Sequence, residues 1–133
     1  MKWLIDASVV VKWIAVEPDS ELAMKFYDAS LVAPPFMLLE LSNILWKKVR
    51  QRELVPSQAT SGLTEVQKRV STPPARGFEP RALEIGLELD HSIYDCLYLA
   101  LAEVMDTPII TADRRLVASC AGTRFARLVE LLA

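Results

Sequence analysis

The sequence predicts an α/β fold with a central, mostly parallel sheet of four to five short strands. Short apolar runs at 2–6, 31–33 and 107–111 alternate with longer helical segments, an order typical of parallel sheets that are covered by helices. The chain has 133 residues, of which 52% are hydrophobic. It shows no internal repeat, so we expect a single domain over residues 1–133 with one core.

The first half of the chain predicts two strands and four helices. Residues 2–6 read as the first strand. Ser8 is the expected cap of the next helix, Asp19 of the second and Ser57 of the fourth, because short polar side chains accept hydrogen bonds from free N–H groups. The expected helices are 9–16, 21–29, 36–52 and a segment ending near 70, and the expected second strand is 31–33.

The second half begins with a Pro-rich connection at 71–77 and a possible short strand near Phe78. Ser92 and Asp113 are the expected caps of two later helices. The remaining expected helices are 79–89, 93–104 and a short one ending near 118, and the remaining strands are 107–111 and an edge strand at 125–127.

The charge pattern limits the classes of protein. The net charge is −2, so the whole molecule is not a basic nucleic-acid binder, although an enzyme that holds phosphates through metal ions needs only a local basic rim. No apolar run reaches the roughly 18 residues of a membrane helix. Asp6 interrupts what would be the apolar core of a signal peptide. We expect a cytoplasmic protein with no membrane contact.

The two cysteines are isolated and suit a reducing compartment. Cys96 lies in an apolar helical stretch and is most simply a core residue. A nucleophilic thiol needs an adjacent base, and the single histidine, His91, is five residues away on what would be a different helix face. The sequence therefore argues against a thiol enzyme.

Four acids occupy unusual positions. Asp6 ends the first strand and Asp113 directly follows the last apolar strand, whereas Glu40 and Asp95 are the only charges in the apolar stretches 36–46 and 92–102. The carboxyl ends of parallel strands meet at one edge of a sheet, where ligand sites form. Each acid alone has a structural alternative, as a helix cap or as a first-turn acid near the helix dipole.

Together the four acids favour a cation site. Two carboxylates about 4 Å apart repel each other by about 4 kcal/mol at an effective dielectric of 20, so a cluster requires divalent cations or raised pKa values. Oxygen ligands without metal-spaced His or Cys favour Mg²⁺ or Mn²⁺ over zinc. Ser8 and Thr111 are possible accessory hydroxyls at the same edge.

Four segments in the same order resemble the motifs of PIN-domain proteins, and most of all the VapC toxins of prokaryotic toxin–antitoxin pairs. They are Leu4–Val9, Glu40–Asn43, Tyr94–Ala102 and Thr111–Leu116. The resemblance implies a three-layer α/β/α fold and a Mg²⁺- or Mn²⁺-dependent endoribonuclease. It also implies a homodimer that is inhibited by a VapB-like antitoxin.

Carried over by motif, the catalytic and metal-binding residues are Asp6, Glu40, Asp95 and Asp113. Some relatives carry a further acid after the fourth, but here Arg114 and Arg115 follow Asp113. These arginines and Lys47 are the candidate RNA contacts, since cations beside the site can bind phosphate. Solvated helix ends are the alternative for the basic cluster that includes Lys47.

Two other classes of function remain open at this stage. A phosphoacceptor receiver domain has similar length, but it would need paired acids after the first strand and a lysine after the last, and neither is present. A catalytically inactive PIN-like protein-interaction module is the stronger alternative. The presence of all four acids favours the nuclease.

Overall fold

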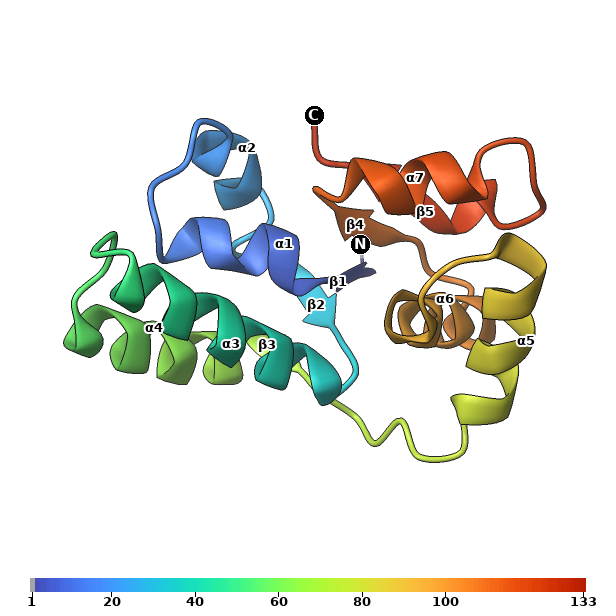
Figure 1. Ribbon diagram of the computed structural model, residues 1–133, viewed down its shortest axis with the longest axis horizontal. Helices are drawn as coiled ribbons and strands as arrows, with labels where there is room; N and C mark the ends of the chain where they lie inside the picture. Colours follow the sequence, from blue (N-terminus) through green and yellow to red (C-terminus); the bar gives the residue numbers. More distant parts are fainter. Residues whose placement is uncertain (1) are drawn as a thin grey trace.

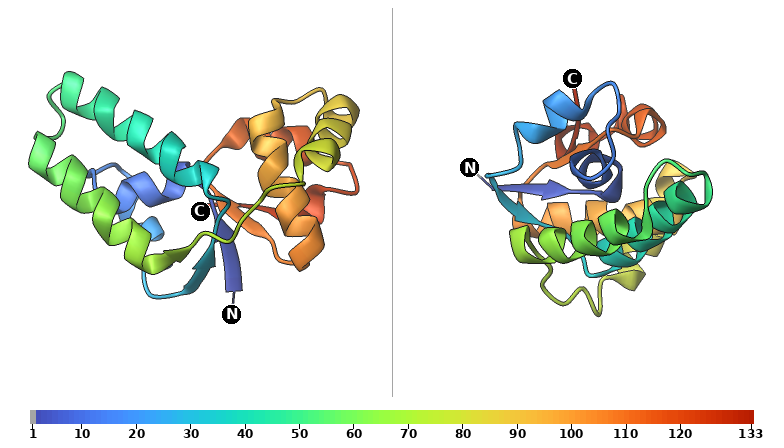
Figure 2. Two further views of the ribbon diagram at one scale, coloured as in Figure 1. Left: turned by 90° about the horizontal axis from the view of Figure 1, so that it is seen from below. Right: turned by 90° about the vertical axis from the view of Figure 1, so that its left-hand side faces the viewer.

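A five-stranded parallel sheet forms the centre of the computed structural model, which describes residues 2–133. The strands are β1 (Lys2–Ile5), β2 (Ser30–Val32), β3 (Val70–Ser71), β4 (Ile109–Thr111) and β5 (Val129–Leu131). They lie in the order β3-β2-β1-β4-β5, and every neighbouring pair is parallel. Helices surround the sheet in a three-layer arrangement (Figure 2). The predicted α/β class and parallel sheet are confirmed.

Two helical pairs stand on opposite sides of the molecule. The α3–α4 pair lies at the left of Figure 1 and the α5–α6 pair at the right, with the sheet between them. None of the helices in residues 2–133 is long and apolar enough to cross a membrane. The helices are α1 (Ala7–Val10), α2 (Ser20–Met24), α3 (Phe36–Arg50), α4 (Pro56–Arg69), α5 (Glu79–Leu89), α6 (Ile93–Met105) and α7 (Arg114–Cys120), with 3-10 turns η1 (Val11–Trp13) and η2 (Ala126–Leu128).

Two predicted helix caps are wrong. Asp6, and not Ser8, caps α1, because its side chain accepts a hydrogen bond from the Ser8 N–H. Val55 precedes α4 and Pro56 is its first residue, so Ser57 lies inside the helix. Proline suits the first helical position because its missing N–H would have no partner there. The expected helix at 9–16 is also shorter, since α1 passes into η1 after Val10.

Two predicted strands are displaced. The third strand is Val70–Ser71, directly after α4, and Phe78 is instead the residue that precedes α5. The expected edge strand at 125–127 is mostly the turn η2, and β5 starts at Val129. In both places a short strand forms where pairing with a neighbour is available, against β2 and β4 respectively.

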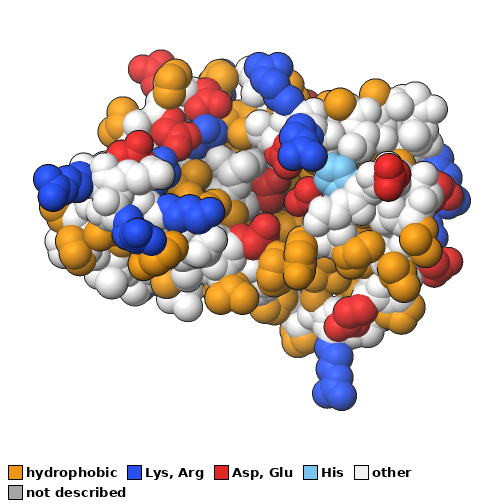
Figure 3. Space-filling model, in the orientation of Figure 1, with side chains coloured by type: hydrophobic (Ala, Val, Ile, Leu, Met, Phe, Trp, Pro, Cys, Tyr) orange, Lys and Arg blue, Asp and Glu red, His pale blue; other side chains and the backbone are white. Residues whose placement is uncertain are grey.

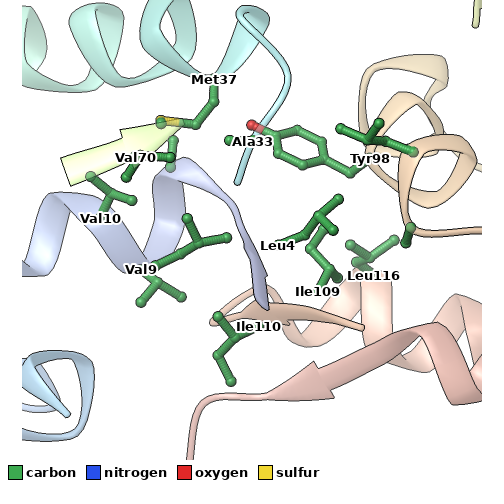
Figure 4. Packing of buried hydrophobic residues seen from close by; sticks show 14 of the residues in the cluster. Leu4, Val9, Val10, Ala33, Met37, Val70, Tyr98, Ile109, Ile110 and Leu116 are labelled. Atoms are coloured by element: carbon green, nitrogen blue, oxygen red, sulfur yellow. The ribbon is translucent and has the colours of Figure 1, made fainter. Parts of the chain in front are cut away.

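The core lies around the two middle strands. Leu4 and Ile109 pair across β1 and β4 and are fully buried. Figure 4 shows the ring of Tyr98 reaching from α6 over these residues, with its hydroxyl directed towards α3. Tyr98 is 1% exposed. This packing holds α6 against the two middle strands, which lead to Asp6 and Asp113.

Candidate active site

The order of the strands places two of the predicted acids side by side. The connection after β1 leads to β2 on one side, whereas the connection after β4 leads to β5 on the other. Ligands of open α/β sheets bind outside the carboxyl ends of the strands at such a switch point. Asp6 directly follows β1, and Asp113 caps α7 after β4. Asp6 and Asp113 therefore follow adjacent parallel strands at the same edge of the sheet.

Asp6 is buried at this end of β1, with 8% of its surface exposed. The Thr111 hydroxyl donates to its Oδ2 at 2.5 Å, and the Ser8 hydroxyl donates to its Oδ1 at 2.5 Å. The same two hydroxyls accept hydrogen bonds from the backbone N–H groups of Asp113 and Ala112. Ser8 and Thr111 thus orient the Asp6 carboxylate and tie the end of β1 to the loop after β4.

Glu40 reaches the site from the second turn of α3. Its Oε1 accepts a hydrogen bond of 2.5 Å from the hydroxyl of Tyr98 on α6. Lys48, two turns further along α3, contacts Glu17 and Glu53. The hydrogen-bond partner of Glu40 is therefore the neutral hydroxyl of Tyr98, and in the part of the chain that the structure describes no cation forms a salt bridge with Glu40.

Asp95 lies in the first turn of α6 and is partly buried. Its Oδ2 contacts Nε2 of His91 at 2.7 Å. Asp113 accepts hydrogen bonds from the Arg115 and Leu116 N–H groups, so it caps α7 as predicted. Asp95 and Asp113 also share a cavity of about 150 Å³. Its lining residues are Asp90, His91, Ser92, Asp95, Asp113 and Arg115.

Three of the acids influence one another electrostatically. Burial raises the pKa of Asp6 to about 6, against hydrogen bonds from Ser8 and Thr111 that lower it, and the charge of Asp95 raises it further. Burial also raises the pKa of Glu40 to about 7, together with the charges of Asp6 and Asp95. Desolvation and the Glu40 carboxylate raise the pKa of Tyr98. Asp6, Glu40 and Asp95 therefore form one electrostatic unit, to which Asp113 is joined through the shared cavity.

The chemistry of this donor set fits a hard divalent cation. The predicted ligands offer only carboxylate oxygens, the type that Mg²⁺ and Mn²⁺ prefer. Two of the carboxyls are held at high pKa values by burial and mutual repulsion, and a cation would relieve both effects. Within residues 2–133, no three His, Cys, Asp or Glu side chains are grouped tightly enough to hold an ion as they stand.

The predicted basic contacts differ in their surroundings. Arg115 lines the cavity of Asp95 and Asp113. The positive charge of Arg114 contributes to lowering the pKa of Asp19. Lys47 lines a separate hollow of about 440 Å³ on α3 with Trp46 and Arg50. Figure 3 shows acidic side chains in a central hollow, with the pale blue histidine beside them and basic side chains around it.

Cys96 is excluded as a nucleophile by its surroundings. Its Sγ lies 3.9 Å from the backbone oxygen of His91, not from the imidazole. Burial and the nearby Asp95 raise the pKa of the Cys96 thiol to about 11. The raised pKa favours the protonated thiol near neutral pH, which agrees with the sequence-based argument against a thiol enzyme.

Two residues of the site were not predicted in these roles. In the sequence, Tyr98 resembles an ordinary core aromatic in the apolar stretch of α6. Its i, i+3 spacing from Asp95 places it on the same helix face as that acid, which is the sequence feature that indicates a position near the site. From the sequence, His91 stands out only as a candidate base for Cys96. Its i, i+4 spacing from Asp95 gives no clear signal, because the helix of Asp95 begins after His91, at Ile93.

Fold and acids together define an α/β protein with an anionic crevice at the switch point of a parallel sheet. A family model of the PIN domain matches residues 3–120. This match covers most of the chain, so the chain belongs to the PIN-domain family.

Curated relatives resemble this chain over most of its length. Ribonuclease VapC1 of Mycobacterium tuberculosis is 28% identical over 120 residues, covering 87% of this chain and 89% of the relative. Ribonuclease VapC3 of Pyrobaculum aerophilum is 27% identical over 121 residues, covering 87% and 92%.

Among solved structures, a Pyrobaculum aerophilum protein has a TM-score of 0.72 at 23% identity, covering 92% of this chain and 90% of its own. Mycobacterium tuberculosis VapC20, a sarcin-ricin loop cleaving toxin, has a TM-score of 0.70 at 14% identity, covering 92% and 96%. VapBC2 from Rickettsia felis, solved with a promoter DNA fragment, has a TM-score of 0.70 at 16% identity and covers both chains fully. These structures share the fold.

Proposed function

We propose that this chain is a Mg²⁺- or Mn²⁺-dependent endoribonuclease that acts as the toxin of a VapBC-type toxin–antitoxin pair. The observation that carries the proposal is the unit formed by Asp6, Glu40 and Asp95 at the switch point, in which burial and repulsion hold two carboxyl pKa values at about 6 and 7. The curated relatives named Ribonuclease VapC support the substrate class.

Asp6, Glu40, Asp95 and Asp113 are the proposed metal ligands and catalytic residues. A bound divalent cation would neutralise phosphate charge and make water a better nucleophile. Ser8 and Thr111 fix both oxygens of Asp6. One of the four carboxylates would accept a proton from the attacking water.

Attack by water defines the products. It needs no RNA 2′-hydroxyl, so the ends should be a 5′-phosphate and a 3′-hydroxyl. Arg115 is the best-placed contact for the phosphate, because it lines the cavity of Asp95 and Asp113. Arg114 and Lys47 are proposed for more distant parts of the RNA. Products that end in a 2′,3′-cyclic phosphate would contradict this reaction.

The proposed partners are RNA, a VapB-like antitoxin and a second copy of the chain. Large apolar side chains that are exposed on α3 and α6, such as Leu39, Trp46 and Tyr94, support protein contacts. We also propose that residues 1–133 act as one PIN-like domain in the cytoplasm, where both the substrate and the antitoxin are available.

The test is cleavage of an end-labelled structured RNA by antitoxin-free protein with Mg²⁺, Mn²⁺ or EDTA. Asp6→Asn and Asp95→Asn should each lower the rate by at least about 100-fold, since each removes a charge that is required for metal binding. Asp106→Asn is the matched control: it lies at the exposed end of the same helix as Asp95 in a left-handed conformation that Asn accepts.

Metal-dependent cleavage by the wild type and by Asp106→Asn, but not by the other two variants, supports the nuclease. Binding of Mn²⁺ without cleavage of diverse RNAs would favour the catalytically inactive interaction module. Failure to bind Mn²⁺ would contradict the site.

A further inference from the structure

His91 contacts one of the proposed metal ligands from outside the acidic unit. Its Nε2 lies 2.7 Å from Oδ2 of Asp95, and its Nδ1 lies 2.8 Å from the hydroxyl of Ser119 on α7. The His91 side chain is only 10% exposed. The imidazole therefore connects the first turn of α6, which carries Asp95, with α7, which follows Asp113.

The contact with Asp95 assigns the role of one ring nitrogen. A carboxylate can only accept a hydrogen bond, so Nε2 is protonated and donates to Asp95. The Ser119 hydroxyl can then donate to an unprotonated Nδ1. The bond that one ring nitrogen makes fixes the tautomer for the other, so Ser119 supports the donation to Asp95.

The backbone also holds His91 in place. Asp90 ends α5 in a left-handed conformation with φ of 52°, and the His91 N–H then donates to the Gly86 carbonyl at 3.1 Å. A Cβ atom at Gly86 would lie 3.0 Å from the His91 carbonyl oxygen. The imidazole is therefore attached to α5 through a tight turn and cannot follow movements of α6 freely.

The contact engages one oxygen of the Asp95 carboxylate. It lies at Oδ2, and both His91 and Asp95 line the cavity that contains Asp113. Oδ1 makes no contact with the imidazole. A carboxylate held at one oxygen loses less rotational freedom when the other binds a cation.

We propose that His91 is a positioning residue that orients Asp95 for divalent-cation binding, with Ser119 as its support. This inference rests on the proposed function, because it concerns the same cation site. His91 need not touch the cation or the RNA; it acts through the Asp95 carboxylate.

The test measures Mn²⁺ affinity by calorimetry, without RNA, for the full chain and three variants. His91→Ala should weaken binding about 10- to 100-fold, as is typical when the hydrogen-bond partner of a metal ligand is removed. Ser119→Ala should weaken it by a smaller factor. His91→Gln should restore most of the affinity, since its amide N–H can donate to Oδ2 from a similar position.

A spectroscopic readout separates positioning from a merely structural role. His91 is the chain's single histidine, so ¹⁵N spectra of the imidazole report on it alone. Saturating Mg²⁺ should shift these resonances in the wild type and in Asp106→Asn, but not in Asp95→Asn. Melting temperatures identify any variant that has lost its fold. If His91→Ala does not fold, Ser119→Ala tests the inference, because it removes only a single hydroxyl.

Equal Mn²⁺ affinity for the wild type, His91→Ala and Ser119→Ala would overturn the inference while leaving the nuclease intact. The inference would also be overturned if the wild type bound Mn²⁺ but its imidazole resonances did not shift on addition of Mg²⁺. A wild type that neither binds Mn²⁺ nor cleaves RNA would instead overturn the proposed function, and the inference with it.

Discussion

At the scale of single residues, the hydrogen bond from Tyr98 to Glu40 shows how a core aromatic serves the site. The ring is buried among apolar residues, whereas the hydroxyl reaches a carboxylate on a different helix. This hydrogen bond stabilises the ionised form of Glu40 and so lowers the pKa of its carboxyl. Without the Tyr98 hydroxyl, the partly buried carboxylate would lose that stabilisation.

Tyr98→Phe removes only that hydroxyl. We expect the free energy of unfolding at pH 8 to fall by about 1–2 kcal/mol, because an ionised, partly buried carboxylate loses a hydrogen bond. At pH 5, where Glu40 is mostly protonated, the loss should be smaller. Urea denaturation at both pH values checks this, with Tyr94→Phe on the same helix as an exposed control. An equal loss at both pH values would contradict the role given to the Glu40 charge.

The raised pKa of Glu40 also predicts how the free energy of unfolding depends on pH. Its pKa is about 7 in the folded chain and 4.5 ordinarily, so the folded state binds more protons between these values. The stabilisation that comes from this protonation is complete below pH 4.5 and is lost as the pH rises through 7.

Glu40→Gln removes this dependence. In EDTA at pH 8 the variant should be more stable than the wild type by about 1 kcal/mol, a value reduced for solvent screening because Glu40 is partly exposed. At pH 4 the two should differ little. Chemical denaturation checks this, and the exposed Glu65→Gln on α4 is the control. A Glu40→Gln variant that is less stable than the wild type at pH 8 would show that the ionised Glu40 does not destabilise the folded state.

The four acids were predictable because charge in an apolar stretch or at a strand tip is conspicuous in a sequence. Tyr98 and His91 were not, since an aromatic residue in an apolar helix and a histidine in a loop both have ordinary structural explanations. Arg114 and Arg115 are adjacent in the chain, and no pattern indicated that only Arg115 would line the cavity.

At the scale of elements, long helices were predictable and short strands were not. The expected helix at 79–89 is confirmed, and α3 and α6 differ from expectation by only a few residues. These segments carry a strong helical pattern of their own. By contrast, β3 has two residues and depends on pairing with β2, which is a tertiary interaction that no local pattern records.

The contact between α5 and α6 gives a prediction at this scale. Gly86→Ala would place a Cβ 2.4 Å from Ile93 Cδ1 and 3.0 Å from the His91 oxygen. Although alanine favours helices by up to about 1 kcal/mol, overpacking costs about 1–3 kcal/mol, so we expect a net loss of about 1 kcal/mol. Thermal melting checks this against Leu87→Ala, an exposed change in the same helix. A Gly86→Ala variant that is more stable than the wild type would show that Ile93 and the turn at His91 can move aside at little cost in free energy.

At the scale of the whole molecule, strand order is the feature that the residues alone did not reveal. The expectation that Asp6 and Asp113 would be neighbours depended on their strands being adjacent, and β1 and β4 do pair. The resemblance to PIN-domain proteins supplied what local patterns lack, because pairing between distant segments leaves little trace in either one.

A divalent cation should change the stability of the whole chain in a pH-dependent way. Since Asp6 and Glu40 have pKa values of about 6 and 7, protons compete with the cation below neutral pH. We expect Mn²⁺ to raise the melting temperature clearly at pH 8 and little at pH 5. The effect should be absent in Asp6→Asn. Equal stabilisation at both pH values would place the ion elsewhere.

The bond between Thr111 and Asp6 joins residues that are 105 positions apart in the chain. Contacts of such long range form slowly, because the entropy of a large loop must be lost before they can contribute. We therefore expect contacts within the helical hairpins to form before the contact that joins Asp6 to Thr111. The proposed nuclease site would be complete only after distant parts of the chain have come together, so a partly folded chain would lack it.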